Sequence, residues 1–83
     1  MSDEYKFDIL VALTADATPG NPVRFGFNVL SKNLGVSKDM LDTMLTELNK
    51  DRYISQYAKK GVDGFTAVVN QKAFDAVEDG SLS

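Results

Sequence analysis

Acidic side chains in close groups are the first feature of this sequence that could do chemistry. Three such groups occur, each within a span of five residues: Asp39 with Asp42, Glu47 with Asp51, and Asp75 with Glu78 and Asp79. Two carboxylates can divide acid and base work between them when both line one cavity. All three groups fall on expected helix faces that point to solvent, so we expect none of them to form an active site.

Several residue types that enzymes commonly use are missing. The chain of 83 residues has no histidine and no cysteine, which removes the usual general base, the thiolate nucleophile, disulfides and the commonest metal ligands. No serine stands in a Gly-x-Ser-x-Gly sequence, and "GVDG" matches neither a phosphate-binding loop nor a calcium loop. The sequence therefore predicts no enzyme, no cofactor and no metal site.

Basic side chains raise a different chemistry, the binding of phosphate. The net charge is −3, but residues 23–61 hold seven basic and four acidic side chains, and both ends of the chain are acidic. A basic middle region permits a local phosphate-binding surface on an acidic protein. The alternative is that these charges are scattered and only keep the protein soluble.

The first half of the chain predicts two helices separated by a loop. An apolar stripe indicates a helix over residues 2–14, and the two prolines and the glycine of "ADATPGNPV" indicate a loop. The next stretch, "VRFGF", is either a short strand or the entry to a helix, which decides whether a sheet has two or three strands. Residues 27–34 predict a short helix that ends at Gly35, a residue suited to a left-handed turn.

The second half predicts a helix, a hairpin and a last helix. Ser37 is the expected N-cap of a helix over residues 37–51, which has the clearest apolar stripe: Met40, Leu41, Met44, Leu45 and Leu48. "YISQYAK" and "FTAVVN" then predict two strands joined by "KGVDG", with Phe65, Ala67 and Val69 on the core face. Asn70 is expected to cap a helix over residues 71–79. We expect one domain over residues 1–80, with residues 81–83 frayed.

The stretch "LGVSKDMLDTMLTEL", within "LSKNLGVSKDMLDTMLTELNKDRYI", resembles a winged helix-turn-helix domain. The likeness rests on the Leu-Gly-Val-Ser turn, the Leu/Met-striped helix after it and the aromatic-Ile pair that opens the hairpin. A more distant likeness is to small, phage-like winged-helix proteins of the YjcQ kind. The resemblance implies an α+β fold, with a three-helix core, a β-hairpin wing and a short C-terminal helix.

The resemblance also implies where nucleic acid would bind. In DNA-binding winged helices the outward face of the third helix enters the major groove, and the wing contacts the backbone. The positions that would face the groove are Lys38, Asp39, Asp42, Thr43 and Thr46. The positions that would contact phosphate are Ser37 at the helix N-terminus, Lys32, Arg52, Lys59 and Lys60.

The acidic residues on that helix depart from the family pattern. No arginine lies on the face, although arginine bound to guanine is the commonest specific contact. Asp39 and Asp42 would approach phosphates, although an aspartate can accept a hydrogen bond from a cytosine amine. Asp39 also has a structural explanation, because a carboxylate in the first turn of a helix favours the helix dipole.

Two functions remain open on the sequence alone. The first is a small transcriptional regulator that binds double-stranded DNA, as a homodimer or within a complex. The second is a winged-helix module that docks a basic protein partner through Asp39, Asp42 and Glu47. No membrane span or signal peptide is recognisable, so we expect a cytoplasmic protein.

A group of apolar side chains could also serve dimerisation or docking. These are Tyr5, Phe25, Phe27, Tyr57 and Val68. If they were exposed together they would form an apolar patch. The alternative is that they cover the edge of the sheet.

Overall fold

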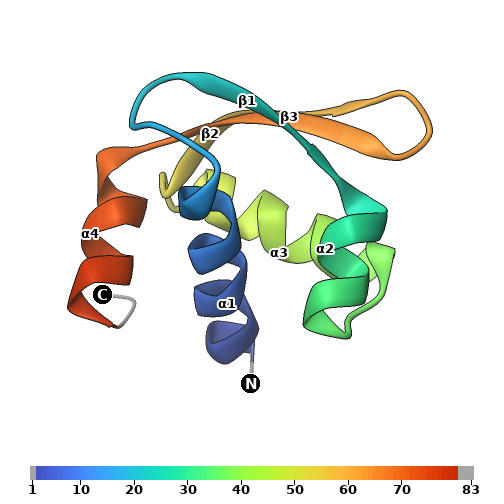
Figure 1. The fold of residues 1–83 in the computed structure, drawn as a ribbon, viewed down its shortest axis with the longest axis horizontal. Helices are drawn as coiled ribbons and strands as arrows, with labels where there is room; N and C mark the ends of the chain where they lie inside the picture. The colour runs from blue at the N-terminus through green and yellow to red at the C-terminus, as the bar shows by residue number, and fades with distance from the viewer. Residues whose placement is uncertain (1, 81–83) are drawn as a thin grey trace.

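The computed structural model describes residues 2–80, which form a small α+β fold. It contains four helices and a three-stranded antiparallel sheet, with the helices on one side of the sheet (Figure 1). In chain order the elements are α1 (Ser2–Ala15), β1 (Pro22–Gly26), α2 (Phe27–Leu34), α3 (Lys38–Lys50), β2 (Ile54–Lys60), β3 (Gly64–Val69) and α4 (Gln71–Asp79). The predicted fraying at residues 81–83 lies outside the described residues.

The sheet answers the question that "VRFGF" left open. Its first four residues lie in strand β1 and Phe27 begins α2, and β1 pairs antiparallel with β3 so that Phe25 faces Phe65. The strand order is β1-β3-β2, so β3 is central and the sheet has three strands. The core face of β3 is as predicted, because Phe65, Ala67 and Val69 are all buried.

The turn between α2 and α3 forms as its residues predict. Gly35 ends α2 in the left-handed region, at φ 69°, and its N–H donates to the carbonyl of Ser31 at 2.9 Å. Ser37 caps α3, because its Oγ accepts a hydrogen bond from the N–H of Met40 at 3.1 Å. The prediction for the last helix is only half met. Asn70 occupies the N-cap position of α4, but its side chain makes no capping hydrogen bond.

The apolar stripe of α3 is buried with one exception. Leu41, Met44, Leu45 and Leu48 belong to the core, but Met40 is 47% exposed, so its predicted burial is wrong. The buried residues repeat at three- and four-residue spacing from Leu41 onward, which is the stripe of a single helix face. Met40 lies at the margin of that face, in the first turn, and remains at the surface.

A β-bulge in β2 gives the hairpin an unexpected shape. Ser55 pairs with Val68 and Ala58 pairs with Thr66, so two residues of β2, Gln56 and Tyr57, stand opposite a single residue of β3. Gln56 takes a positive φ of 55° at this point. A bulge re-aims the side chains beside it, and here the ring of Tyr57 packs edge-on against Phe65 with 5.5 Å between centroids.

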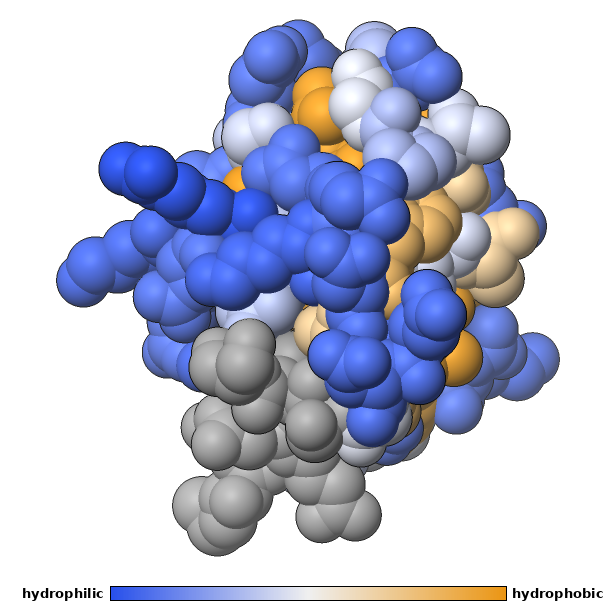
Figure 2. Space-filling model, turned by 90° about the vertical axis from the view of Figure 1, so that its left-hand side faces the viewer, coloured by the Kyte–Doolittle hydropathy of each residue, from blue (hydrophilic) through white to orange (hydrophobic). Residues whose placement is uncertain are grey.

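The exposed apolar patch that the sequence left open as a possibility does not form. Of the five residues, Tyr5 is 38% exposed, whereas Phe27 and Val68 are buried, and Phe25 and Tyr57 are half-buried against Phe65. The bulge and the pairing of β1 turn these rings inward, so they complete the core instead of covering the surface. The side of the molecule that carries α4 is mostly hydrophilic, and apolar atoms show only between hydrophilic side chains (Figure 2).

Candidate nucleic-acid interface

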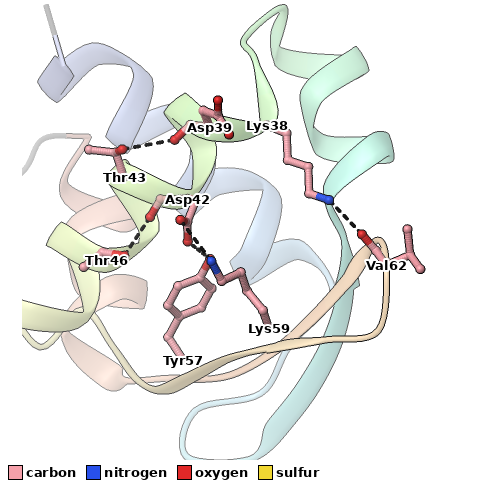
Figure 3. Close-up of polar contacts among 8 residues, drawn as sticks. All are labelled: Lys38, Asp39, Asp42, Thr43, Thr46, Tyr57, Lys59 and Val62. Carbon is pink, nitrogen blue, oxygen red and sulfur yellow. Dashed lines mark hydrogen bonds and ion pairs between the residues drawn. The ribbon is translucent and has the colours of Figure 1, made fainter.

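The outer face of α3 is defined here by Asp39, Thr43 and Thr46, which are all exposed. Asp39 and Thr43 lie on the side of α3 away from the hairpin (Figure 3). Both threonine hydroxyls donate to carbonyls one turn earlier, Thr43 to Asp39 at 3.0 Å and Thr46 to Asp42 at 2.8 Å. Each hydroxyl oxygen can still accept a hydrogen bond, and each methyl group is available for contact with a base.

The side chain of Asp42 points toward the hairpin, and not outward from α3 to where the major groove of DNA was expected. Its Oδ1 accepts a hydrogen bond from the Tyr57 hydroxyl at 2.6 Å, and its Oδ2 lies 3.3 Å from Lys59 Nζ (Figure 3). The hydrogen bond from Tyr57 and the nearby Lys59 ammonium lower the pKa of the Asp42 carboxyl, against a smaller opposite effect of burial. Burial and the Asp42 carboxylate raise the pKa of Tyr57, which therefore stays a donor. The expectation that the Asp42 side chain projects freely from the outer face of α3 is wrong, because Tyr57 and Lys59 hold its carboxylate.

Replacing Tyr57 with phenylalanine tests how firmly this contact holds the hairpin to α3. The change removes one hydrogen bond to a partly exposed carboxylate, so we expect the free energy of unfolding to fall by about 1 kcal/mol at pH 7. Because folding lowers the pKa of Asp42 below 3.8, its contribution is complete above pH 3.8 and is lost as pH falls through the folded pKa. Urea unfolding at pH 7 and pH 3 measures both effects.

The two variants Tyr57→Phe and Asp42→Asn provide a control for each other. Each should show less loss of stability on acidification than the parent chain does. The double variant should be less destabilised than the sum of the single variants, because both remove the same contact. Fully additive effects, or an unchanged pH dependence in both, would show that this hydrogen bond does not couple the two elements.

The tip of the hairpin is held to α3 by a second contact. Lys38 Nζ donates to the carbonyl of Val62 at 2.7 Å and lies 5.3 Å from the centre of the Phe27 ring. This ammonium group was expected to face the groove, but it reaches sideways to the hairpin (Figure 3). The hydrogen bond from Lys38 to the Val62 carbonyl lies at the surface and is weak enough to be replaced by a bond to a phosphate. Lys38 therefore stays within reach of a phosphate bound beside α3 and the hairpin.

The remaining predicted phosphate contacts lie around α3 and are solvent-exposed. Lys32 is in the last turn of α2, Ser37 caps α3, Arg52 follows α3 and Lys60 ends β2. The side chains of Lys32, Arg52 and Lys60 make no hydrogen bond or ion pair with any residue in the described range 2–80. Arg52 has a positive φ of 69° and its carbonyl accepts a hydrogen bond from Asn70 Nδ2 at 2.9 Å.

A second acidic residue of α3 is also neutralised by a lysine. Glu47 Oε1 lies 2.5 Å from Nζ of Lys6, a largely buried side chain of α1. With Asp42 paired to Lys59, two of the three acids assigned to a basic-partner surface are already in ion pairs. Only Asp39 makes no such pair among the described residues.

Two residues of this region could not be assigned from the sequence. Tyr57 is the donor to Asp42, and its backbone N–H donates to Asn49 Oδ1 at 3.2 Å, which supports the bulge from α3. Alternating strand geometry places Tyr57 by counting from its neighbours, and a bulge breaks that count. The only sequence signal for the supported bulge was Asn49, a polar residue at the inward edge of α3.

No protein-family model, no curated protein and no solved structure matches this chain. Within residues 2–80, no group of three or more acidic side chains is arranged to hold a metal ion. In the same part of the chain, no helix has the length and apolar character needed to cross a membrane.

Proposed function

We propose that this chain is a winged helix-turn-helix domain that binds double-stranded DNA as a small transcriptional regulator. The observation that carries the proposal is the placement of α3. Its outer face is exposed behind a tight turn from α2, and the hairpin of β2 and β3 lies beside it. In this proposal α3 enters the major groove and the hairpin is the wing.

The charges around α3 support DNA over a basic protein partner. Lys59 and Lys6 neutralise Asp42 and Glu47, so the acidic face that a basic partner would need is reduced to Asp39. Exposed basic side chains at Lys32 and Lys60 flank the helix and can reach phosphates. So few phosphate contacts would give weak, salt-dependent binding, and two copies on adjacent half-sites would strengthen it.

Binding to random-sequence duplex DNA at about 50 and 200 mM salt tests the proposal, because phosphate contacts weaken steeply over this range. Lys60→Ala removes an unpartnered ammonium of the wing, so we expect roughly fivefold weaker binding at the lower salt and a salt slope shallower by about one. Lys59→Ala should cost less, because Lys59 already pairs with Asp42.

The matched control is Lys72→Gln, which removes one positive charge from α4. Lys72 bonds to the carbonyl of Asp51 and lies over the Tyr53 ring, so its fold should be checked by circular dichroism before the comparison. The control should bind DNA as the parent chain does. No binding at 50 mM salt, or equal losses in Lys60→Ala and Lys72→Gln, would rule out the wing as a phosphate contact.

A further inference from the structure

The outer edge of β1 is open to an added strand. Within residues 2–80, β1 pairs only with β3 and lies at the edge of the sheet. The N–H of Phe27 donates to the carbonyl of Asp63 at 2.8 Å, which places that residue pair in hydrogen-bonding register. Because this register alternates along an antiparallel pair, the N–H and C=O of Arg24 and the N–H of Gly26 point away from β3. These three groups can bond to another extended chain.

An apolar hollow lies beside this edge. It has a volume of about 460 Å³ and lies between α1, α2 and β1. Its lining residues are Ala12, Ala15, Asp16, Arg24, Phe25, Gly26, Val29, Leu30 and Asn33. The two alanines leave room that larger side chains would fill, and Val29 is 62% exposed at the rim. An aliphatic side chain that entered the hollow would cover this apolar surface.

Arg24 supplies a positive charge at the same edge. Its guanidinium lies directly on Gly64, since a Cβ added there would stand 2.8 Å from Nη2. A second hollow of about 370 Å³ adjoins it and includes Asp63, but Asp63 Oδ1 already accepts a hydrogen bond from the N–H of Asn28 at 3.0 Å. Arg24 forms no ion pair with another described residue, so an incoming carboxylate would be its partner.

We propose that the edge of β1 binds an extended peptide segment of a partner protein in which acidic and apolar residues alternate. A residue opposite Arg24 would project on the same sheet face as the guanidinium, so it would be acidic. Its neighbours would project to the opposite face, so one apolar side chain would enter the 460 Å³ hollow. β3 separates this edge from β2, and the inference does not depend on DNA binding.

A second copy of the chain fits this edge less well than such a peptide. Two β1 strands paired about their centre would place Arg24 against Arg24, and like charges directly opposite each other destabilise a strand pair. Pro22, at the start of β1, also lacks the N–H that a longer pairing would use. An acidic peptide places a carboxylate against Arg24 in place of a second arginine, and only one strand of the pair then lacks the proline N–H.

The test measures the binding of a fluorescein-labelled seven-residue peptide of alternating leucine and glutamate by anisotropy. One matched peptide carries lysine in place of glutamate, and another carries methyl groups on alternate backbone nitrogens. We expect the glutamate peptide to bind, and both matched peptides to bind at least about tenfold more weakly. In ¹⁵N-labelled protein, the amide resonances of Arg24 and Gly26 should shift and become protected from exchange.

Variants of the protein separate charge pairing from non-specific attraction. Arg24→Glu should weaken the glutamate peptide by at least about tenfold and strengthen the lysine peptide, whereas Lys50→Glu should change neither by more than about twofold. Three results would overturn the proposal: no binding, equal binding of the methylated peptide, or resonance shifts confined to α3 and the hairpin. So would sedimentation showing a dimer that Arg24→Glu dissociates, because the edge would then belong to a second copy.

Discussion

Phe65→Ala should lower the free energy of unfolding by about 3–5 kcal/mol, the largest effect of any single substitution considered for this chain. Phe65 is fully buried on the central strand β3. Its ring contacts three others, with centroids 5.3 Å from Phe25, 4.8 Å from Phe27 and 5.5 Å from Tyr57. These rings come from β1, α2 and β2, so one side chain joins three elements.

The size of this effect matters because the domain is small. A chain of this length has a total stability of roughly 4–12 kcal/mol, so loss of the Phe65 ring would leave the fold marginal. Urea unfolding followed by circular dichroism measures the change. Val62→Ala is the control, because Val62 is 92% exposed and should change the stability by less than about 0.5 kcal/mol. If Phe65→Ala lowers the free energy of unfolding by less than about 1 kcal/mol, the packing of the four aromatic rings is not what stabilises the core.

Local signals in the sequence predicted much of the fold. The Leu/Met stripe, Gly35 and Ser37 each act within one or two turns of helix, so α2, α3 and the turn between them follow from near neighbours. The core face of β3 follows from simple alternation. The strand at "VRFGF" was left open because its state depends on pairing with β3, about forty residues later in the chain.

The candidate site was less predictable because it depends on the bulge. The extra residue at Gln56–Tyr57 reverses which side chain faces α3, and no local composition marks its position. The contacts of Asp42 with Tyr57 and Lys59 span 15 and 17 residues, so they follow only once the bulge is known. The sequence therefore predicted that Thr43 and Thr46 are exposed on α3, but it did not predict the contacts that hold Asp42.

The pairing of these charges changes how an acidic third helix bears on DNA binding. Asp42 and Glu47 count against nucleic acid in the sequence, but each is matched by a lysine in the fold. The same pairing leaves Lys59 less available to a phosphate, so the hairpin of β2 and β3 is also less basic than its sequence indicates. Asp39 is then the residue on which the two proposed functions differ most.

If the chain binds DNA as proposed, Asp39→Lys should therefore have the largest effect on that binding. Asp39 is exposed in the first turn of α3 and makes no ion pair with the described residues. If α3 enters the groove, the change removes a repulsion and adds a cation at the surface, so affinity for random duplex DNA should rise by roughly tenfold to a hundredfold at 50 mM salt. The salt slope should steepen by about one.

The control for this change is Asp75→Lys, which alters the charge of α4 by the same amount. A similar gain in both variants would mean that net charge, not the position of α3, controls binding, and the α3 outer face would lose its assigned role. The alternative function makes the opposite prediction, because a basic protein partner would lose its remaining unpaired acid and dock more weakly to the Asp39→Lys variant. The cost to the helix dipole is only about 0.3–1 kcal/mol, so both variants should stay folded and the comparison reports on binding.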